Sequence, residues 1–113
     1  MRVGEFKMNS ERLKEKLKTY RKEDIIITAH ANIQAYVREI NIEEVKENII
    51  NPIKLVYSEQ QESKNKNEEK YACYFAYLDN LYHKYAIVLN GKIIIVTIVK
   101  INRRWQHLVD KRK

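Results

Sequence analysis

The spacing of apolar residues changes at Asn51-Pro52, and this change constrains the fold more than any other feature of the chain. Before it, apolar residues recur three or four positions apart, as they do along one face of a helix. After it, short runs rich in Ile, Val and Tyr are separated by turn residues, a pattern typical of strands. A proline keeps its predecessor out of the helical region, so a helix must end here. The sequence therefore predicts an α+β domain with a helical first half and an antiparallel sheet in its second half.

The first predicted helix carries a narrow apolar stripe on an otherwise charged segment. Ser10 is placed to cap this helix, and the stripe consists of Leu13, Leu17 and Tyr20, spaced four and three residues apart. Because an isolated helix this short is marginal in water, we expect the stripe to pack on the rest of the domain or on a partner chain. The run Ile25–Thr28 is β-branched and too short for a helix, which indicates a buried strand.

Two further helices are predicted before the proline. The first occupies residues 29–40, where the apolar residues at helical spacing are Ile33, Tyr36, Val37 and Ile40. Asn41 is expected to cap the next helix, and Glu44, three residues later, completes a capping-box pattern. Almost no linker separates these two helices, so they must pack as a tight hairpin or corner.

Four strands are predicted after the proline, over residues 53–57, 70–78, 82–89 and 92–101. The segment 58–69 has no apolar residue and is expected to be a mobile polar loop. Asn90-Gly91 predicts a type I′ hairpin turn, which needs positive φ at both residues. On a two-residue period both faces of the sheet receive some of the tyrosines of the two middle strands, which are Tyr71, Tyr74, Tyr77, Tyr82 and Tyr85.

The length and composition limit the kind of protein further. A chain of 113 residues, of which 44% are hydrophobic, suffices for one domain with one core, over residues 1–113. The single cysteine, Cys73, excludes an internal disulfide and a multi-cysteine zinc site, and this fits a reducing cytoplasm. Neither a membrane-spanning run nor an export signal is evident. Gly4 and Gly91 are isolated, so the sequence has no glycine-rich phosphate loop, and no metal or other cofactor is predicted.

The formal net charge is +7, and most of the surplus lies at the two ends of the chain. Residues 1–24 hold eight lysines and arginines against five acidic residues. Residues 100–113 hold six lysines and arginines against one aspartate. Such a surplus favours a polyanionic partner, which can be a nucleic acid, an anionic membrane surface or an acidic protein. The alternative is a solvated surface that keeps the protein soluble.

Three short motifs resemble a family of toxin-like domains. They are Ile27-Thr28-Ala29-His30-Ala31, then Ile42-Glu43-Glu44-Val45, and finally Asn51-Pro52. In their order the chain resembles an uncharacterised RelE-like domain family of the RelE/ParE toxin superfamily, which is related to the BrnT ribonuclease toxins. The resemblance covers about residues 24–101. The basic N-terminal helix of residues 1–23 and the loop 58–69 lie outside it or decorate it, and a basic tail, residues 102–113, follows it.

The resemblance implies both a fold and a function. The fold is a two-layer RelE-like sandwich, in which an N-terminal helix and a strand–helix–helix unit precede a meander of three to four antiparallel strands. The function is that of an RNA-binding and RNA-cleaving toxin-like domain, a metal-independent endoribonuclease of the cytoplasm. Its partners are RNA or the ribosome and an antitoxin protein. The alternatives are a non-catalytic nucleic-acid-binding or protein-interaction module with the same fold, or a homodimer held by the first helix.

Metal-independent RNA cleavage requires a base, an acid and cations near the phosphate, and two residues are the candidates for catalysis. His30 lies where a strand gives way to a helix, and free backbone N–H groups there favour an anion. We predict His30 as general base or phosphate contact, with a capping or packing role as the alternative. Lys84 is predicted to assist it. Lys84 follows His83, which shares a strand face with Tyr85.

The C-terminal residues are the predicted RNA-binding segment. Cations that alternate with an aromatic side chain suit phosphate contacts combined with base stacking. The predicted nucleic-acid-binding residues are Lys100, Arg103, Arg104, Trp105 and His107. A solubilising tail that Trp105 anchors to the domain is the alternative.

Overall fold

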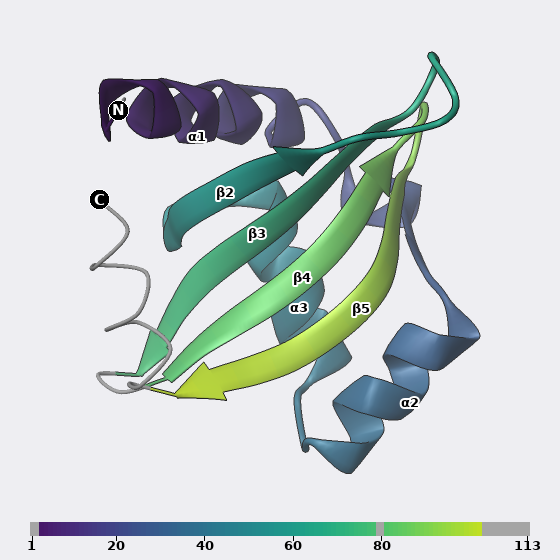
Figure 1. The fold of residues 1–113 in the computed structure, drawn as a ribbon. Helices are drawn as coiled ribbons and strands as arrows, with labels where there is room; N and C mark the ends of the chain where they lie inside the picture. The colour runs from purple at the N-terminus through teal and green to yellow at the C-terminus, as the bar shows by residue number, and fades with distance from the viewer. Residues whose placement is uncertain (1–2, 79–80, 103–113) are drawn as a thin grey trace.

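The computed structural model describes residues 3–78 and 81–102, and these form three α-helices, a short 3-10 helix and five strands (Figure 1). The α+β class predicted from the sequence is confirmed. The elements follow one another as α1 (Val3–Leu17), η1 (Lys22–Asp24), β1 (Ile25–Ile27), α2 (Ala29–Val37), α3 (Ile42–Ile50), β2 (Leu55–Gln61), β3 (Glu69–Leu78), β4 (Leu81–Leu89) and β5 (Ile93–Asn102).

The five strands form one mixed sheet in the order β1-β5-β4-β3-β2. Strands β2 to β5 pair antiparallel with their neighbours. β1 instead lies parallel to β5, with Ile25 opposite Ile93 and Ile27 opposite Ile95. The prediction of an antiparallel sheet therefore holds for β2 to β5 but is wrong for the pair of β1 and β5. The difference arises because β1 comes from the first half of the chain and no hairpin turn joins it to β5, so the antiparallel direction is not imposed on this pair.

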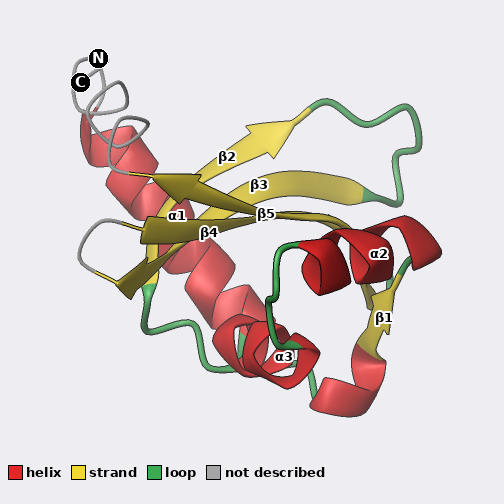
Figure 2. Ribbon diagram, turned by 90° about the horizontal axis from the view of Figure 1, so that it is seen from below, coloured by secondary structure: helices red, strands yellow, loops and turns green. Residues whose placement is uncertain are grey.

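The helices lie on one face of the sheet, so the fold has two layers (Figure 2). α1 packs along β2, and α2 packs along β5. None of the described elements covers the opposite face, which Figure 1 turns toward the viewer. The core between the layers consists of Leu13, Leu17, Ile25, Ala31, Ala35, Ile40, Val45, Ile49, Leu55, Cys73, Phe75, Tyr85, Ile87, Leu89, Ile93, Ile95 and Ile98.

Helix α1 begins well before Ser10, so the prediction that Ser10 caps it is wrong. The Ser10 side chain is buried instead, and its Oγ lies 3.1 Å from the Oγ of Ser58 in β2. The predicted packing of the apolar stripe is confirmed. Leu13 and Leu17 are 2% and 0% exposed in the chain's own core, and Tyr20 packs partly against them. The stripe therefore does not form a contact between two chains.

Helix α2 packs on the sheet through alanines rather than through its large apolar residues. Its N-cap is Thr28, whose Oγ1 accepts a hydrogen bond from the N–H of Ala31 at 3.1 Å. Ala31 and Ala35 are fully buried, and Gln34 beside them accepts a hydrogen bond from the N–H of Ile98 at 2.9 Å. The short alanine side chains let the helix approach β5 closely. The residues left exposed are Ile33, Tyr36 and Val37.

Two predictions about caps and turns have different outcomes. Asn41 caps α3 as predicted, since its Oδ1 accepts a hydrogen bond from the N–H of Glu43 at 2.8 Å. The β4–β5 connection is not the predicted type I′ turn. Leu89 pairs with Ile93 across a three-residue loop, in which only Gly91 has a positive φ, of 71°. A loop of this length needs one residue in the left-handed region, and glycine adopts it without steric cost.

Strand β2 continues into the segment that was predicted to be a loop. Ser58 lies opposite Cys73 of β3, and the pairing continues to Gln61 opposite Lys70. Ser58 is buried, whereas the next three residues are exposed. Polar residues suit this position because β2 is an edge strand, where the outer side meets water. The connecting loop is therefore shortened to residues 62–68.

Candidate nucleic-acid interface

Three lysines lie at the end of the sheet where β4 begins. Lys84 follows His83 in β4, and Lys100 lies directly opposite His83 in β5. The backbone carbonyl of Lys54, just before β2, accepts a hydrogen bond from the N–H of Ala76 in β3 at 2.9 Å. We call Lys54, Lys84 and Lys100 the cationic end of the sheet.

Six lysines of the described chain are paired with carboxylates, whereas those of the cationic end are not; Lys64, Lys66 and Lys70, in or beside the loop before β3, are also unpaired. Among residues 10–77 and 81–101, no carboxylate lies within 4.0 Å of the ammonium groups of Lys54, Lys84 or Lys100. The cationic end therefore presents positive charge that no described acidic residue offsets. The six ion pairs, at 2.6 to 3.8 Å, are Lys14–Glu11, Lys16–Glu69, Lys18–Glu15, Lys22–Glu47, Lys46–Glu43 and Lys92–Asp24.

Two lysines of the cationic end lie over tyrosine rings. The Nζ of Lys84 is 5.5 Å from the ring centroid of Tyr74, which packs against Tyr57 with 5.4 Å between the centroids. The Nζ of Lys100 is 5.9 Å from the ring centroid of Tyr77. Each distance allows attraction between the ammonium group and the face of the ring. Cations and aromatic rings therefore lie together on both sides of the sheet, because successive residues point to opposite faces.

His83 is buried in a polar network beneath the cationic end. Its side chain is 0% exposed, and its Nδ1 lies 2.9 Å from the hydroxyl of Tyr85. That hydroxyl accepts a hydrogen bond from the Nδ2 of Asn48 in α3 at 3.0 Å. The phenol then donates its one proton to Nδ1, so Nδ1 is the acceptor nitrogen of the neutral imidazole. The imidazole proton is therefore assigned to Nε2. The predicted common face of His83 and Tyr85 is confirmed.

Burial sets the protonation of this network. Burial first, and then the positive charges of Lys100 and Lys54, lower the pKa of His83 to about 4. Burial also raises the pKa of Tyr85, although its hydrogen bond from Asn48 opposes that change. His83 is therefore neutral near pH 7, and as a buried group it does not serve as a solvent-facing acid or base.

The structure does not bring together the two residues predicted for catalysis. His30 is exposed in the first turn of α2, on the side of β5 that carries β1. Lys84 lies near the start of β4, whereas α2 packs along the neighbouring strand β5, as Figure 1 shows. No hydrogen bond or ion pair joins His30 to Lys84 in the part of the chain that the structure describes.

The predicted RNA-binding segment is only partly described. Lys100 is exposed near the end of β5, at the cationic end. The other four predicted positions, Arg103, Arg104, Trp105 and His107, lie outside the described residues. Their predicted contacts with RNA stay predictions.

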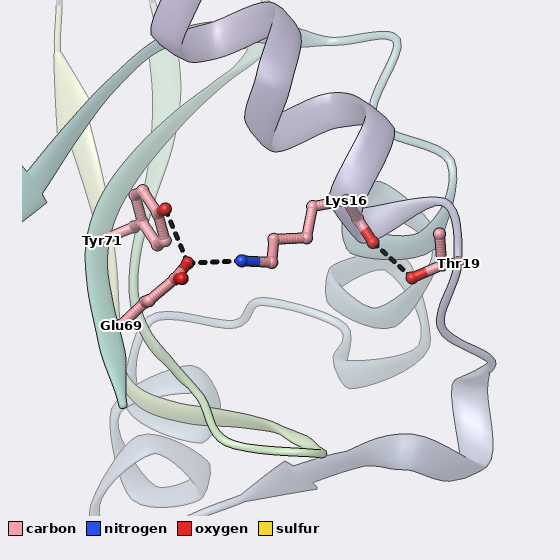
Figure 3. Close-up of polar contacts among 4 residues, drawn as sticks. All are labelled: Lys16, Thr19, Glu69 and Tyr71. Atoms are coloured by element: carbon pink, nitrogen blue, oxygen red, sulfur yellow. Dashed lines mark hydrogen bonds and ion pairs between the residues drawn. The ribbon is translucent and has the colours of Figure 1, made fainter. Parts of the chain in front are cut away.

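A second polar cluster lies at the opposite end of the sheet and was not predicted (Figure 3). The Nζ of Lys16 in α1 is 2.6 Å from the Oε1 of Glu69, which also accepts a hydrogen bond from the hydroxyl of Tyr71 at 2.9 Å. These contacts, led by Lys16, lower the pKa of Glu69. Burial and the hydrogen bond to Glu69 raise the pKa of Tyr71 to about 12. The charges neutralise each other, so the cluster attaches α1 to β3 rather than attracting a charged ligand.

Beside this cluster is an open cavity of about 230 Å³. Leu89 forms its apolar part, and the two oppositely charged side chains of Lys16 and Glu69 meet in its wall. With so little uncompensated charge, it is a weaker candidate than the cationic end. The other lining residues are Tyr20, Lys66, Asn67, Asn90 and Gly91.

Lys54 and Asn48 belong to the site but were missed by the sequence analysis. Lys54 precedes a strand. No local sequence pattern shows that this strand will pair with the one that carries Tyr77, which stacks on His83. Asn48 is a polar residue inside a helix, which alone predicts exposure. The usable signal was its place three residues after Val45, on the side of α3 that is buried.

Comparison with known proteins gives the chain no family: no family model, no curated protein and no solved structure matches it. Within the described residues, no group of three His, Cys, Asp or Glu side chains could hold a metal ion. No helix there is long and apolar enough to cross a membrane. Fold and site together define a two-layer α+β domain with a cationic, tyrosine-bearing end of its sheet.

Proposed function

We propose that the protein binds single-stranded RNA through the cationic end of its sheet. The observation that carries the proposal is the set of three lysines without a described carboxylate partner, two of which lie over tyrosine rings. Ammonium groups neutralise phosphates, and aromatic side chains stack on unpaired bases. In sequence, the basic segment with Arg103, Arg104, Trp105 and His107 follows directly after β5, and we include it in the interface.

The proposal extends to a RelE-like role in the cytoplasm. The order of strand, helix, helix and four further strands after α1 supports a RelE-like arrangement. In such a role the RNA is free or ribosome-bound, and an antitoxin protein is a second partner. RNA binding without cleavage is the function that the described geometry supports best, because the histidine nearest the cationic end is buried and neutral.

RNA affinity should depend on these three lysines more than on net charge. We expect the variant Lys54→Ala/Lys84→Ala/Lys100→Ala to lower the logarithmic salt dependence of binding by about 2, since each phosphate contact on a single strand contributes about 0.7. Fluorescence anisotropy with a labelled oligouridylate at several salt concentrations measures this slope. The matched control is Lys18→Ala/Lys22→Ala/Lys46→Ala, which removes the same charge from ion-paired lysines. An equal loss in both variants would show that net charge, and not the cationic end, drives binding.

Metal-independent RNA cleavage is the second candidate function, and the exposure of His30 at the start of α2 favours it. A helix start supplies free N–H groups that attract a phosphate, and the imidazole beside them is open to solvent. We expect cleavage of single-stranded RNA in the presence of a chelator, slowed about 10²–10⁴-fold in His30→Ala. Gel analysis of labelled RNA measures the rate, and Asn32→Ala, at an exposed position two residues further along the same helix, is the control. Cleavage at an unchanged rate in His30→Ala would remove His30 from the mechanism.

A further inference from the structure

The turn before β2 and the three strands β3, β4 and β5 place Lys54, Tyr77, His83 and Lys100 in succession across the cationic end. The rings of Tyr77 and His83 are stacked, with 4.3 Å between their centroids and 22° between their planes. Lys100 lies opposite His83 on one side, with its Nζ 5.9 Å from the centre of the Tyr77 ring. On the other side, the carbonyl of Lys54 is hydrogen-bonded to Ala76, the residue before Tyr77. The ammonium group of Lys100 thus lies over the stack of phenol on imidazole, and the backbone of Lys54 lies beside the strand that carries the phenol.

The imidazole of His83 contributes a donor that has no acceptor. Its Nδ1 faces the hydroxyl of Tyr85, so Nε2 carries the proton and points away from Tyr85. Nε2 is buried and has no hydrogen-bond partner in the described part of the chain. A buried donor left in this way destabilises the folded protein, because it has lost its hydrogen bond to water and gained no other. The site therefore combines two lysines without a carboxylate partner, Lys54 and Lys100, with the unpaired N–H of His83. A negatively charged hydrogen-bond acceptor would satisfy all three groups.

We propose that Lys54, Lys100 and His83 form a subsite for one phosphate group, and that a backbone phosphate of bound RNA occupies it. The identity of the ligand as RNA rests on the proposed function, whereas the phosphate chemistry rests on the donors themselves. A phosphate has several charged acceptor oxygens and can accept from all three groups at once. Tyr77 is half-buried over the His83 ring, so the phosphate meets the ammonium groups first and a turn of Tyr77 exposes Nε2.

Nuclear magnetic resonance of the His83 imidazole tests the subsite in the full chain. Inorganic phosphate and a dodecauridylate are titrated separately at low salt. A phosphate between Lys54 and Lys100 offsets their repulsion of the imidazolium, so we expect either ligand to raise the pKa of His83 from about 4 by about one unit. We also expect a downfield shift of the Nε2 proton as it gains an acceptor.

Matched single variants assign the effect to the two lysines. Lys54→Gln and Lys100→Gln should each abolish the phosphate-induced shift of the His83 signals and weaken RNA binding by about tenfold. Lys92→Gln removes a lysine that is paired with Asp24 near the other end of the sheet, and it should leave both measurements unchanged. These substitutions lie at exposed positions, so the folded state should persist in all three variants.

The two ligands separate failure of the subsite from failure of the proposed function. The subsite is wrong, and RNA binding stands, if RNA binds but the His83 signals do not move. The same holds if they move as far in Lys54→Gln and Lys100→Gln as in the original protein. If phosphate moves them and RNA does not bind, the proposed function falls and the subsite remains as one for a free phosphate group. If neither ligand acts on His83 and RNA does not bind, both are wrong.

Discussion

Replacing Leu17 with alanine should lower the free energy of unfolding by about 3 kcal/mol. Leu17 is 0% exposed, and its side chain lies in the core formed by α1 and the helix-bearing face of the sheet. The substitution removes buried apolar surface and leaves a cavity that a rigid sheet cannot collapse to fill. Urea unfolding followed by circular dichroism measures the loss.

The control for this prediction is Lys18→Ala, which changes the next, exposed residue and should alter stability by no more than about 0.5 kcal/mol. If Leu17→Ala were as stable as the original protein, α1 would be an appendage and not part of the domain. The expected result instead makes residues 10–17 as necessary to folding as the sheet. The contacts of Ser10 with Ser58 and of Lys16 with Glu69 support the same conclusion.

Acidification from pH 6.5 to pH 5 should cost the protein about 1–2 kcal/mol of stability through His83 alone. The pKa of His83 is about 4 in the folded protein, below the ordinary value of about 6.5 for an unfolded chain. Between these two pKa values the imidazole of His83 is protonated in the unfolded chain but stays neutral in the folded protein. The full stability is therefore present above about pH 6.5, and it falls as the pH drops toward 4.

Urea unfolding at pH 7, 6 and 5 measures this dependence, and His83→Gln is the comparison. The variant lacks the titrating group, so its stability should change less between pH 7 and pH 5 whatever its absolute value. The pH window avoids Glu69 and Asp24, whose pKa values are lowered by their partners and which stay ionised above pH 5. An equal pH dependence in both proteins would mean that His83 becomes protonated in the folded state as easily as in the unfolded chain.

The helical and strand segments could be predicted because their periodicity is local, but the sequence does not determine which face is buried. In α2 the periodic residues Ile33 and Tyr36 suggested the inner face, whereas Ala31 and Ala35 form it. The buried face of α2 is the one with short side chains, because these let the helix approach β5 closely. In the same way, the parallel pairing of β1 with β5 joins residues far apart in sequence, and no local pattern specifies it.

The candidate site was predictable to the same extent. The two-residue period of β4 correctly placed His83 and Tyr85 on one face, and Lys100 was identified from its basic surroundings. Their depth could not be foreseen, because His83 is buried by the stacked ring of Tyr77 from another strand. Asn48 joins the network only through the way α3 packs on the sheet.

The hydrogen bond from the N–H of Ile98 to the side chain of Gln34 also opposes edge-to-edge aggregation of the sheet. β1 pairs with only the first three residues of β5, so the rest of that strand has no described strand beside it on this side. A bare strand edge is a template on which a second molecule can add a strand and begin to aggregate. Gln34 occupies the backbone amide of Ile98 that such a strand would need, and the body of α2 stands over the same edge. The amide side chain of Gln34 thus ends the sheet where β1 is too short to do so.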